Sequence, residues 1–93
     1  MQLKASVGTP HHLETKIVKT GRDARVFLEK RLRERQVWAS RYNTALEAEL
    51  IAILEELNSL PIGALPVGEL KEWTVADEVT GVTFVYQLVK EKP

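Results

Sequence analysis

The chain has 93 residues, of which 44% are hydrophobic and 28% are charged, a composition typical of one small globular domain and not of a disordered chain. It contains no cysteine, which excludes a disulfide scaffold, thiolate metal sites and thiol catalysis. The formal net charge is zero, yet residues 1–43 carry ten Lys or Arg against four Asp or Glu, whereas residues 44–93 carry three against nine. A chain polarised in this way can bind a polyanion, pair with itself or fold one half onto the other.

The N-terminal third predicts two short strands. Apolar and polar residues alternate over residues 2–7, and Gly8-Thr9-Pro10 then indicates a turn. A second, less regular alternation over residues 13–19 predicts the next strand.

No segment of the sequence predicts export or membrane insertion. The first seven residues are too short and too polar to be the apolar core of a signal peptide. No apolar run approaches the roughly 20 residues that a bilayer-spanning helix needs. We therefore expect a soluble, cytoplasmic protein.

The middle of the chain predicts two amphipathic helices. The first follows Thr20, which with Asp23 three residues later resembles a capping box, and extends to about Gln36 or slightly beyond. The second follows Thr44, which with Glu47 fits the capping box itself, and ends before a proline.

The segment between the two helices leaves two arrangements open. Residues 37–43 contain neither glycine nor proline, so one long bent helix over residues 22–58 is an alternative to a helical hairpin. We favour the hairpin, because a chain this short buries more surface by folding back on itself.

The C-terminal third predicts a β-hairpin. Its strands are residues 70–77 and 82–89, Gly81 suits a loop position with positive φ, and residues 90–93 form a charged tail. The sequence as a whole predicts a single α+β domain over residues 1–93. Its expected architecture is a helical hairpin packed on a small, mostly antiparallel sheet of three to four strands that ends in the C-terminal β-hairpin.

The last strand carries apolar residues on both faces, although one helical layer covers only one of them. We expect Val85 and Val89, on the second face, to be covered by the crossing segment 61–68 or by a second copy of the chain. The sequence thus predicts a homodimer, and the alternative is two exposed valines of no further consequence.

The first helix is strongly basic. Seven Lys or Arg lie within residues 22–41, next to Trp38 and Tyr42. Arginine pairs bidentately with phosphate and aromatic rings stack on unpaired bases, so this combination favours a nucleic-acid, ribonucleoprotein or acidic protein partner. The contact residues that we predict are Arg31, Arg33, Arg35, Trp38, Arg41 and Tyr42.

The second helix offers an alternative fate for these arginines. Its acidic residues lie antiparallel to them in a helical hairpin and would neutralise the basic surface by internal pairing. They are Glu47, Glu49, Glu55 and Glu56.

No motif predicts a metal, a cofactor or a catalytic nucleophile. His11 and His12 are adjacent, so their side chains tend to point apart, and no further histidine completes a metal-ligand set. Phosphate-binding glycine loops and a nucleophile elbow are absent from the sequence.

The order of elements, with Gly68-Glu69-Leu70-Lys71-Glu72-Trp73 leading to Val82-Thr83-Phe84-Val85-Tyr86, resembles the layout of the RelE/ParE group of small toxins. This resemblance implies an RNA-cleaving enzyme in which Tyr86 and Lys90 transfer protons.

Three function classes therefore remain. We favour a small non-catalytic binding or regulatory protein, homodimeric, that contacts its partner through the basic helix. The alternatives are the toxin-like ribonuclease and a structural subunit of a phage or bacterial assembly.

Overall fold

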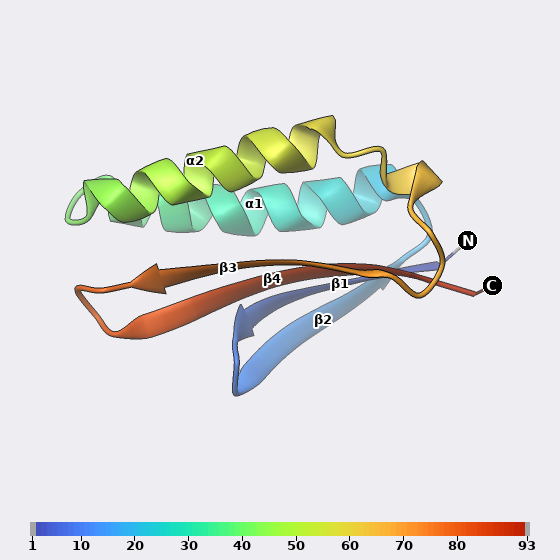
Figure 1. The fold of residues 1–93 in the computed structure, drawn as a ribbon, viewed down its shortest axis with the longest axis horizontal. Helices are drawn as coiled ribbons and strands as arrows, with labels where there is room; N and C mark the ends of the chain where they lie inside the picture. Colours follow the sequence, from blue (N-terminus) through green and yellow to red (C-terminus); the bar gives the residue numbers. More distant parts are fainter. Residues whose placement is uncertain (1, 93) are drawn as a thin grey trace.

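A computed structural model describes residues 2–92 and contains two helices packed on a four-stranded sheet. Figure 1 shows both helices lying on the same face of the sheet, with the opposite face uncovered. The elements are β1 (Gln2–Thr9), β2 (His12–Val18), α1 (Gly21–Ala39), α2 (Thr44–Ser59), the 3-10 turn η1 (Ile62–Ala64), β3 (Leu70–Asp77) and β4 (Val82–Glu91). The expected α+β architecture is confirmed.

The sheet has the strand order β2-β1-β4-β3, and every neighbouring pair is antiparallel. The first and last strands of the sequence therefore pair at the centre of the sheet, and Ala5 lies opposite Leu88. Gly81 closes the β3–β4 loop at a φ of 76°, as its position in the sequence predicts. No helix within residues 2–92 combines the length and apolarity needed to cross a membrane.

The helix starts show one confirmed cap and one correction. Thr20 caps α1, and its hydroxyl accepts a hydrogen bond from the Asp23 amide. The cap of α2 is Asn43 and not Thr44, because the Asn43 side-chain oxygen accepts from the Leu46 amide at 3.1 Å and Thr44 is already helical. Both residues are good caps, so the sequence does not distinguish neighbouring positions.

The two helices form an antiparallel hairpin, so the alternative of one long helix is wrong. Helix α1 continues to Ala39, three residues beyond Gln36, and the chain then turns over residues 40–43. Arg25 secures the far end of the hairpin, because its guanidinium donates to the carbonyl oxygens of Leu60 at 2.8 Å and Asn58 at 3.3 Å. Arg25 thereby satisfies carbonyl groups at the end of α2 that no helical amide reaches.

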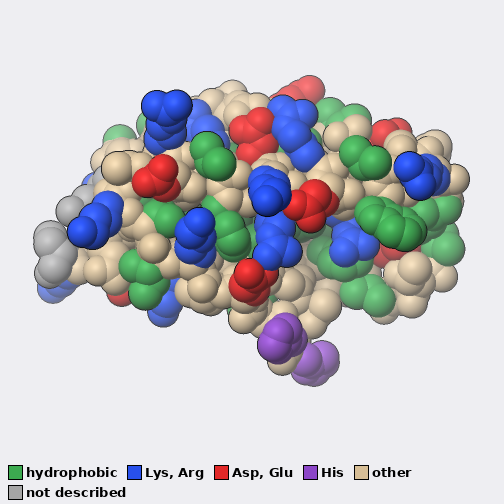
Figure 2. Space-filling view, turned by 180° about the vertical axis from the view of Figure 1, so that it is seen from behind, with side chains coloured by type: hydrophobic (Ala, Val, Ile, Leu, Met, Phe, Trp, Pro, Cys, Tyr) green, Lys and Arg blue, Asp and Glu red, His purple; other side chains and the backbone are tan. Residues whose placement is uncertain are grey.

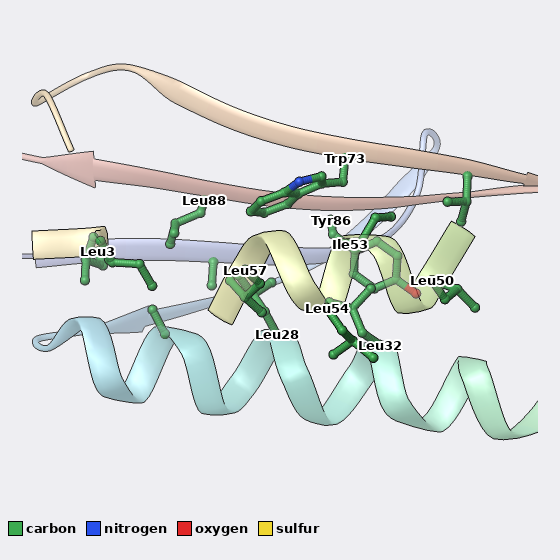
Figure 3. Close-up of a cluster of buried hydrophobic side chains, with 14 of the residues drawn as sticks. Leu3, Leu28, Leu32, Leu50, Ile53, Leu54, Leu57, Trp73, Tyr86 and Leu88 are labelled. Atoms are coloured by element: carbon green, nitrogen blue, oxygen red, sulfur yellow. The ribbon is translucent and has the colours of Figure 1, made fainter. Parts of the chain in front are cut away.

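The hydrophobic core lies between the helical hairpin and the covered face of the sheet. Leucines of both helices meet the inward side chains of the sheet, among them Trp73 and Tyr86 (Figure 3). This arrangement follows from the 3.6-residue period of the helices and the two-residue period of the strands. The fully buried leucines are Leu3, Leu28, Leu32, Leu46, Leu50, Leu57 and Leu88.

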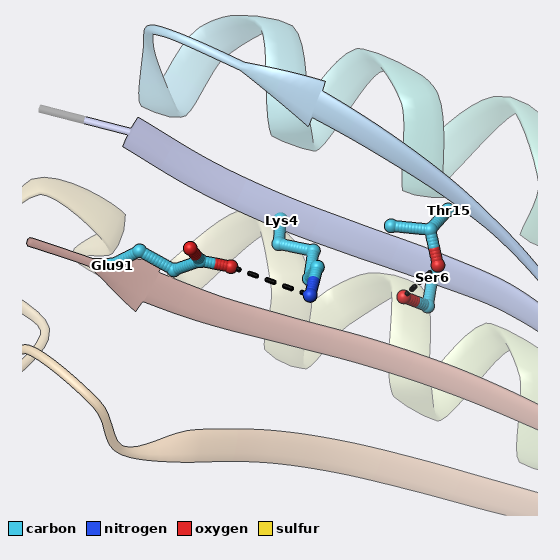
Figure 4. Close-up of polar contacts among 4 residues, drawn as sticks. All are labelled: Lys4, Ser6, Thr15 and Glu91. Atoms are coloured by element: carbon cyan, nitrogen blue, oxygen red, sulfur yellow. Dashed lines mark hydrogen bonds and ion pairs between the residues drawn. The ribbon is translucent and has the colours of Figure 1, made fainter.

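The uncovered face of the sheet is partly polar. Lys4 pairs with Glu91 at 3.5 Å, and Ser6 shares a hydrogen bond with Thr15 at 2.9 Å (Figure 4). The prediction of a charged tail from residue 90 is therefore wrong in part, because Lys90 and Glu91 extend β4. Their pairing with the start of β1 continues the ladder beyond residue 89.

Val85 and Val89 lie on this uncovered face, since they alternate with the core residues Tyr86 and Leu88. Val85 is only 5% exposed within the single chain, and Val89 is half-buried. The crossing segment 61–68 runs beside the end of β4, where the Gly68 amide donates to the Lys90 carbonyl oxygen at 2.7 Å.

Candidate anion-binding groove

Helix α1 presents two different basic stripes. Arg31, Arg35 and Trp38 recur at i, i+4 and i+7, so they share one side of the helix. Lys30, Arg33 and Val37 share an adjacent side in the same way. Figure 2 shows the face of the molecule formed by α1 and β2, where Lys and Arg side chains are spread among fewer acidic ones.

The first stripe forms one wall of a groove of about 420 Å³ between α1 and the sheet. The β1–β2 hairpin and β4 supply the other walls. This volume is within the range of small-molecule sites in proteins, roughly 300–1,000 Å³. The lining residues whose side chains matter most for its chemistry are His12, Arg31, Arg35, Trp38, Phe84 and Tyr86.

Arg35 is the central charge of the groove. Its guanidinium carbon lies 4.2 Å from the centre of the Phe84 ring, and its side chain is partly buried. Within residues 2–92 it forms no ion pair. The Phe84 ring and the neighbouring Tyr42 hydroxyl orient Arg35, and because both partners are neutral its charge is still able to bind an anion.

Tyr86 lies beside this charge, on the same wall as Phe84. Burial raises the pKa of Tyr86 to about 12, although the positive charges of Arg35 and Arg31 act in the opposite direction. The phenol is therefore neutral at physiological pH. Trp38 differs from Tyr86 in being 61% exposed, so its indole is available to a ligand.

The other two predicted arginines of α1 have carboxylate partners. Arg31 pairs with Glu14 of β2 and lies over the Phe27 ring at 5.7 Å from its centre. Arg33 pairs with Glu29, four residues earlier on α1, at 2.8 Å. Both pairs are at the surface, where such interactions contribute about 0–1 kcal/mol and yield readily to a competing anion.

None of the α2 carboxylates pairs with an arginine of α1 in the described part of the chain. Glu47 accepts a hydrogen bond from Gln36 at 3.3 Å. Glu56 accepts from Lys71 at 2.7 Å and from the Trp73 indole at 2.9 Å, and these contacts lower the pKa of Glu56. The internal neutralisation that the sequence left open is therefore not what the structure shows.

Tyr42 is a neighbour of Arg35 and also takes part in a second site, which we call the Asp77 cluster (Tyr42, Asn43 and Asp77). The Tyr42 hydroxyl donates to one carboxylate oxygen of Asp77 at 2.6 Å, and the Asn43 amide donates to the other at 3.2 Å. The backbone amides of Val79 and Thr80 also donate to Asp77, whose side chain is buried. The cluster thus joins the turn between the helices to the β3–β4 loop.

These hydrogen bonds change the ionisation of both groups. The Tyr42 hydroxyl, followed by the other donors, lowers the pKa of Asp77 from 3.8 to about 2 against the opposing effect of burial. Asp77 in turn raises the pKa of Tyr42 through the shared hydrogen bond, against the opposing effect of the neighbouring Arg35. Of the six predicted contact residues, Tyr42 is therefore engaged within the fold, whereas Arg41 lies exposed in the same turn.

Tyr86 and Lys90 lie on the same strand face but do not converge. They are four residues apart on β4, which separates their Cα atoms by about 13 Å. The Lys90 ammonium donates to the Gly63 carbonyl oxygen at 2.9 Å, at the end of the sheet away from the groove. This geometry gives no support to proton transfer between the two residues.

Sequence reasoning missed the far wall of the groove. Phe84 and His12 come from β4 and β2, and only the pairing of both strands with β1 brings them opposite α1. The adjacent His11 lies exposed in the β1–β2 turn, and no group of three His, Asp or Glu within residues 2–92 is arranged to hold a metal ion. The spacing of Arg31, Arg35 and Trp38, in contrast, was visible in the sequence.

Comparison with protein-family models, with curated proteins and with solved structures yields no match to this chain. Function therefore has to be inferred from the groove and from the charges around it.

Proposed function

We propose that this protein is a small non-catalytic binding protein that contacts single-stranded nucleic acid through the basic side of α1. The single observation that carries the proposal is that Arg35 has no carboxylate partner within residues 2–92 and lies in a groove beside an exposed tryptophan.

The charge around α1 supports an anionic partner. Residues 12–43, which span β2 and α1, contain nine Lys or Arg against four Asp or Glu. The acidic residues of α2 do not pair with this surface, so its positive potential extends into solvent.

The aromatic residues favour nucleic acid over an acidic protein. Single-stranded nucleic acid offers both phosphates for arginine and exposed base faces for an indole, and Trp38 stands next to Arg35 on the same stripe. An acidic peptide would use the arginines, but its Asp and Glu side chains offer no aromatic face to stack on Trp38.

An ionic-strength series tests this function. Binding of single-stranded RNA and DNA to the wild type should weaken linearly with the logarithm of salt concentration. Substitution of Arg31, Arg33 and Arg35 by Gln should reduce the slope by roughly 2, because each lost phosphate contact on a single strand accounts for about 0.7.

A matched control removes the same charge elsewhere. Lys4, Lys71 and Lys90 lie away from the basic side of α1, and their replacement by Gln should leave the slope nearly unchanged. An equal loss in both triple variants would contradict a specific surface. Binding of poly-glutamate as tight as that of RNA would favour an acidic protein partner instead.

The proposal includes a homodimer through the uncovered face of the sheet. Leu13, Ile17 and Leu70 are exposed there, and Leu70 is the direct cross-strand neighbour of Val89. Four strands about 4.8 Å apart and about 25 Å long give the uncovered face an area of roughly 500 Å² per chain. Two chains related by a two-fold axis would together bury about 1,000 Å², the lower limit for a specific interface. Val85 lies on this face but is already buried within the single chain, so Leu13, Ile17, Leu70 and Val89 would form the dimer contact.

Sedimentation of two matched variants tests the dimer. Leu70→Glu places a charge on the proposed interface and should yield a monomer, whereas Val26→Glu changes a similarly exposed residue on α1 and should remain dimeric. A monomeric wild type at micromolar concentration would contradict the dimer. A larger ring or filament would favour the structural subunit of an assembly.

A further inference from the structure

We infer that the groove between α1 and the sheet holds one nucleotide of an unpaired strand, with its phosphate on Arg35 and its base on Trp38. This inference rests on the proposed function and goes further, because it assigns a single nucleotide to one groove and its phosphate to Arg35 alone among the arginines of α1.

Arg35 is suited to the phosphate because its environment already fixes it. The guanidinium stacks on Phe84 at 4.2 Å and is partly buried, so little side-chain freedom remains to be lost on binding. Its neighbours in the described chain, the Phe84 ring and the Tyr42 hydroxyl, are neutral, and a partly buried charge without a counter-charge gains when an anion binds beside it. Arg33 lacks these properties, because it is exposed and already paired with Glu29.

Trp38 is suited to the base because of its place on the same stripe. It follows Arg35 by three residues, which puts the two side chains next to each other on the helix surface. Its indole is 61% exposed while lining the groove, an uncommon exposure for the largest apolar side chain. Stacking on an aromatic ring accepts any base, because every base has a π-face.

Carboxylates at the groove limit what it accepts. Glu14 is neutralised by Arg31, and Glu34 is exposed to solvent at the rim. Arg35 therefore remains the one arginine of the groove without a carboxylate partner in the described chain, and the groove suits one phosphate and not a run of them.

Fluorescence titration with a short oligouridylate tests the inference. We expect binding to quench the emission of Trp38, whereas Trp73 is buried in the core and should not respond. Arg35→Gln should raise the dissociation constant about tenfold or more, because it removes a charge-assisted contact to phosphate. Trp38→Leu should raise it at least about fivefold, whereas Trp38→Phe retains a stacking surface and should change it by less than about twofold.

The matched control is Arg33→Gln, which removes the same charge from the neighbouring stripe. If Arg35→Gln and Arg33→Gln lose equal affinity, while binding still depends on salt and Trp38 emission is not quenched, the groove is not the nucleotide site. The proposed function would still stand. Absence of binding at every salt concentration would overturn both. The same oligouridylate paired with its oligoadenylate complement should leave Trp38 emission unchanged. If uridine monophosphate binds as tightly as the oligonucleotide, the groove does not recognise a strand.

Discussion

Two polar sites lie near the C-terminal end of α1 and differ in whether their charges are satisfied. In the Asp77 cluster, one buried carboxylate accepts hydrogen bonds from Tyr42, Asn43 and two backbone amides. In the groove, Arg35 is held by the Phe84 ring but has no carboxylate partner within residues 2–92.

This difference separates residues that build the fold from residues that are available to a partner. A fully hydrogen-bonded network holds two distant segments in one arrangement, and a ligand would have to break it to bind. A charged side chain that the fold orients but does not neutralise is stabilised when an oppositely charged ligand binds to it. Substitutions should therefore affect stability at one site and binding at the other.

The largest effect should come from Asp77→Ala. The substitution removes four hydrogen bonds to a buried carboxylate that joins two distant segments, so the melting temperature should fall by roughly 10 °C, measured by circular dichroism. Glu78→Ala, in the same loop but exposed, is the control and should change it by less than about 4 °C. Similar losses in both variants would mean that the cluster has no special role in stability.

Arg35→Gln should show the opposite pattern. The affinity for single-stranded RNA should fall about tenfold, while the melting temperature stays within about 4 °C of the wild type, since the lost stacking on Phe84 is partly solvent-exposed. A large loss of stability would place Arg35 with the Asp77 cluster as a structural residue. Calorimetry and binding on the same samples distinguish these outcomes.

A smaller effect should appear in the pH dependence of stability. The pKa of Asp77 is about 2 in the folded chain and 3.8 without the contacts of the fold. The unfolded state therefore binds more protons than the folded state between these pH values. The contribution of Asp77 is complete above pH 3.8 and is lost as the pH falls to about 2. The difference in melting temperature between the wild type and Asp77→Asn should therefore narrow over this range, and a constant difference would contradict the lowered pKa.

The sequence predicted what depends on local pattern. Strand alternation, helix spacing and the Thr20 cap act over a few residues, so both helices and all four strands appear within two or three residues of their predicted ends, apart from the tail that joins β4. Arg31, Arg35 and Trp38 were predicted as contact residues, and their local spacing of i, i+4 and i+7 is what puts them on one side of α1.

Contacts between distant segments could not be predicted. Tyr42 looked like a contact residue because its acceptor, Asp77, lies 35 residues away in the chain. Arg25 belonged to the basic cluster in the sequence, yet it caps α2 through carbonyl groups 33 and 35 residues later. Phe84, which orients Arg35, is likewise joined to α1 only through the fold. Side-chain charge alone therefore did not separate structural arginines from available ones.

The smallest predicted effect concerns Arg31, which is intermediate between the two sites. It lines the groove but pairs with Glu14 at the surface, so Glu14 competes with any phosphate for its guanidinium. Glu14→Gln should raise the affinity for single-stranded RNA by about two- to fivefold, because exposed pairs of this kind are weak. Glu29→Gln releases Arg33 on the other stripe and should raise the affinity for single-stranded RNA less, as measured at the same ionic strength. If the two substitutions have equal effects, Arg31 acts as a general surface charge and Arg35 alone distinguishes the groove from the rest of α1.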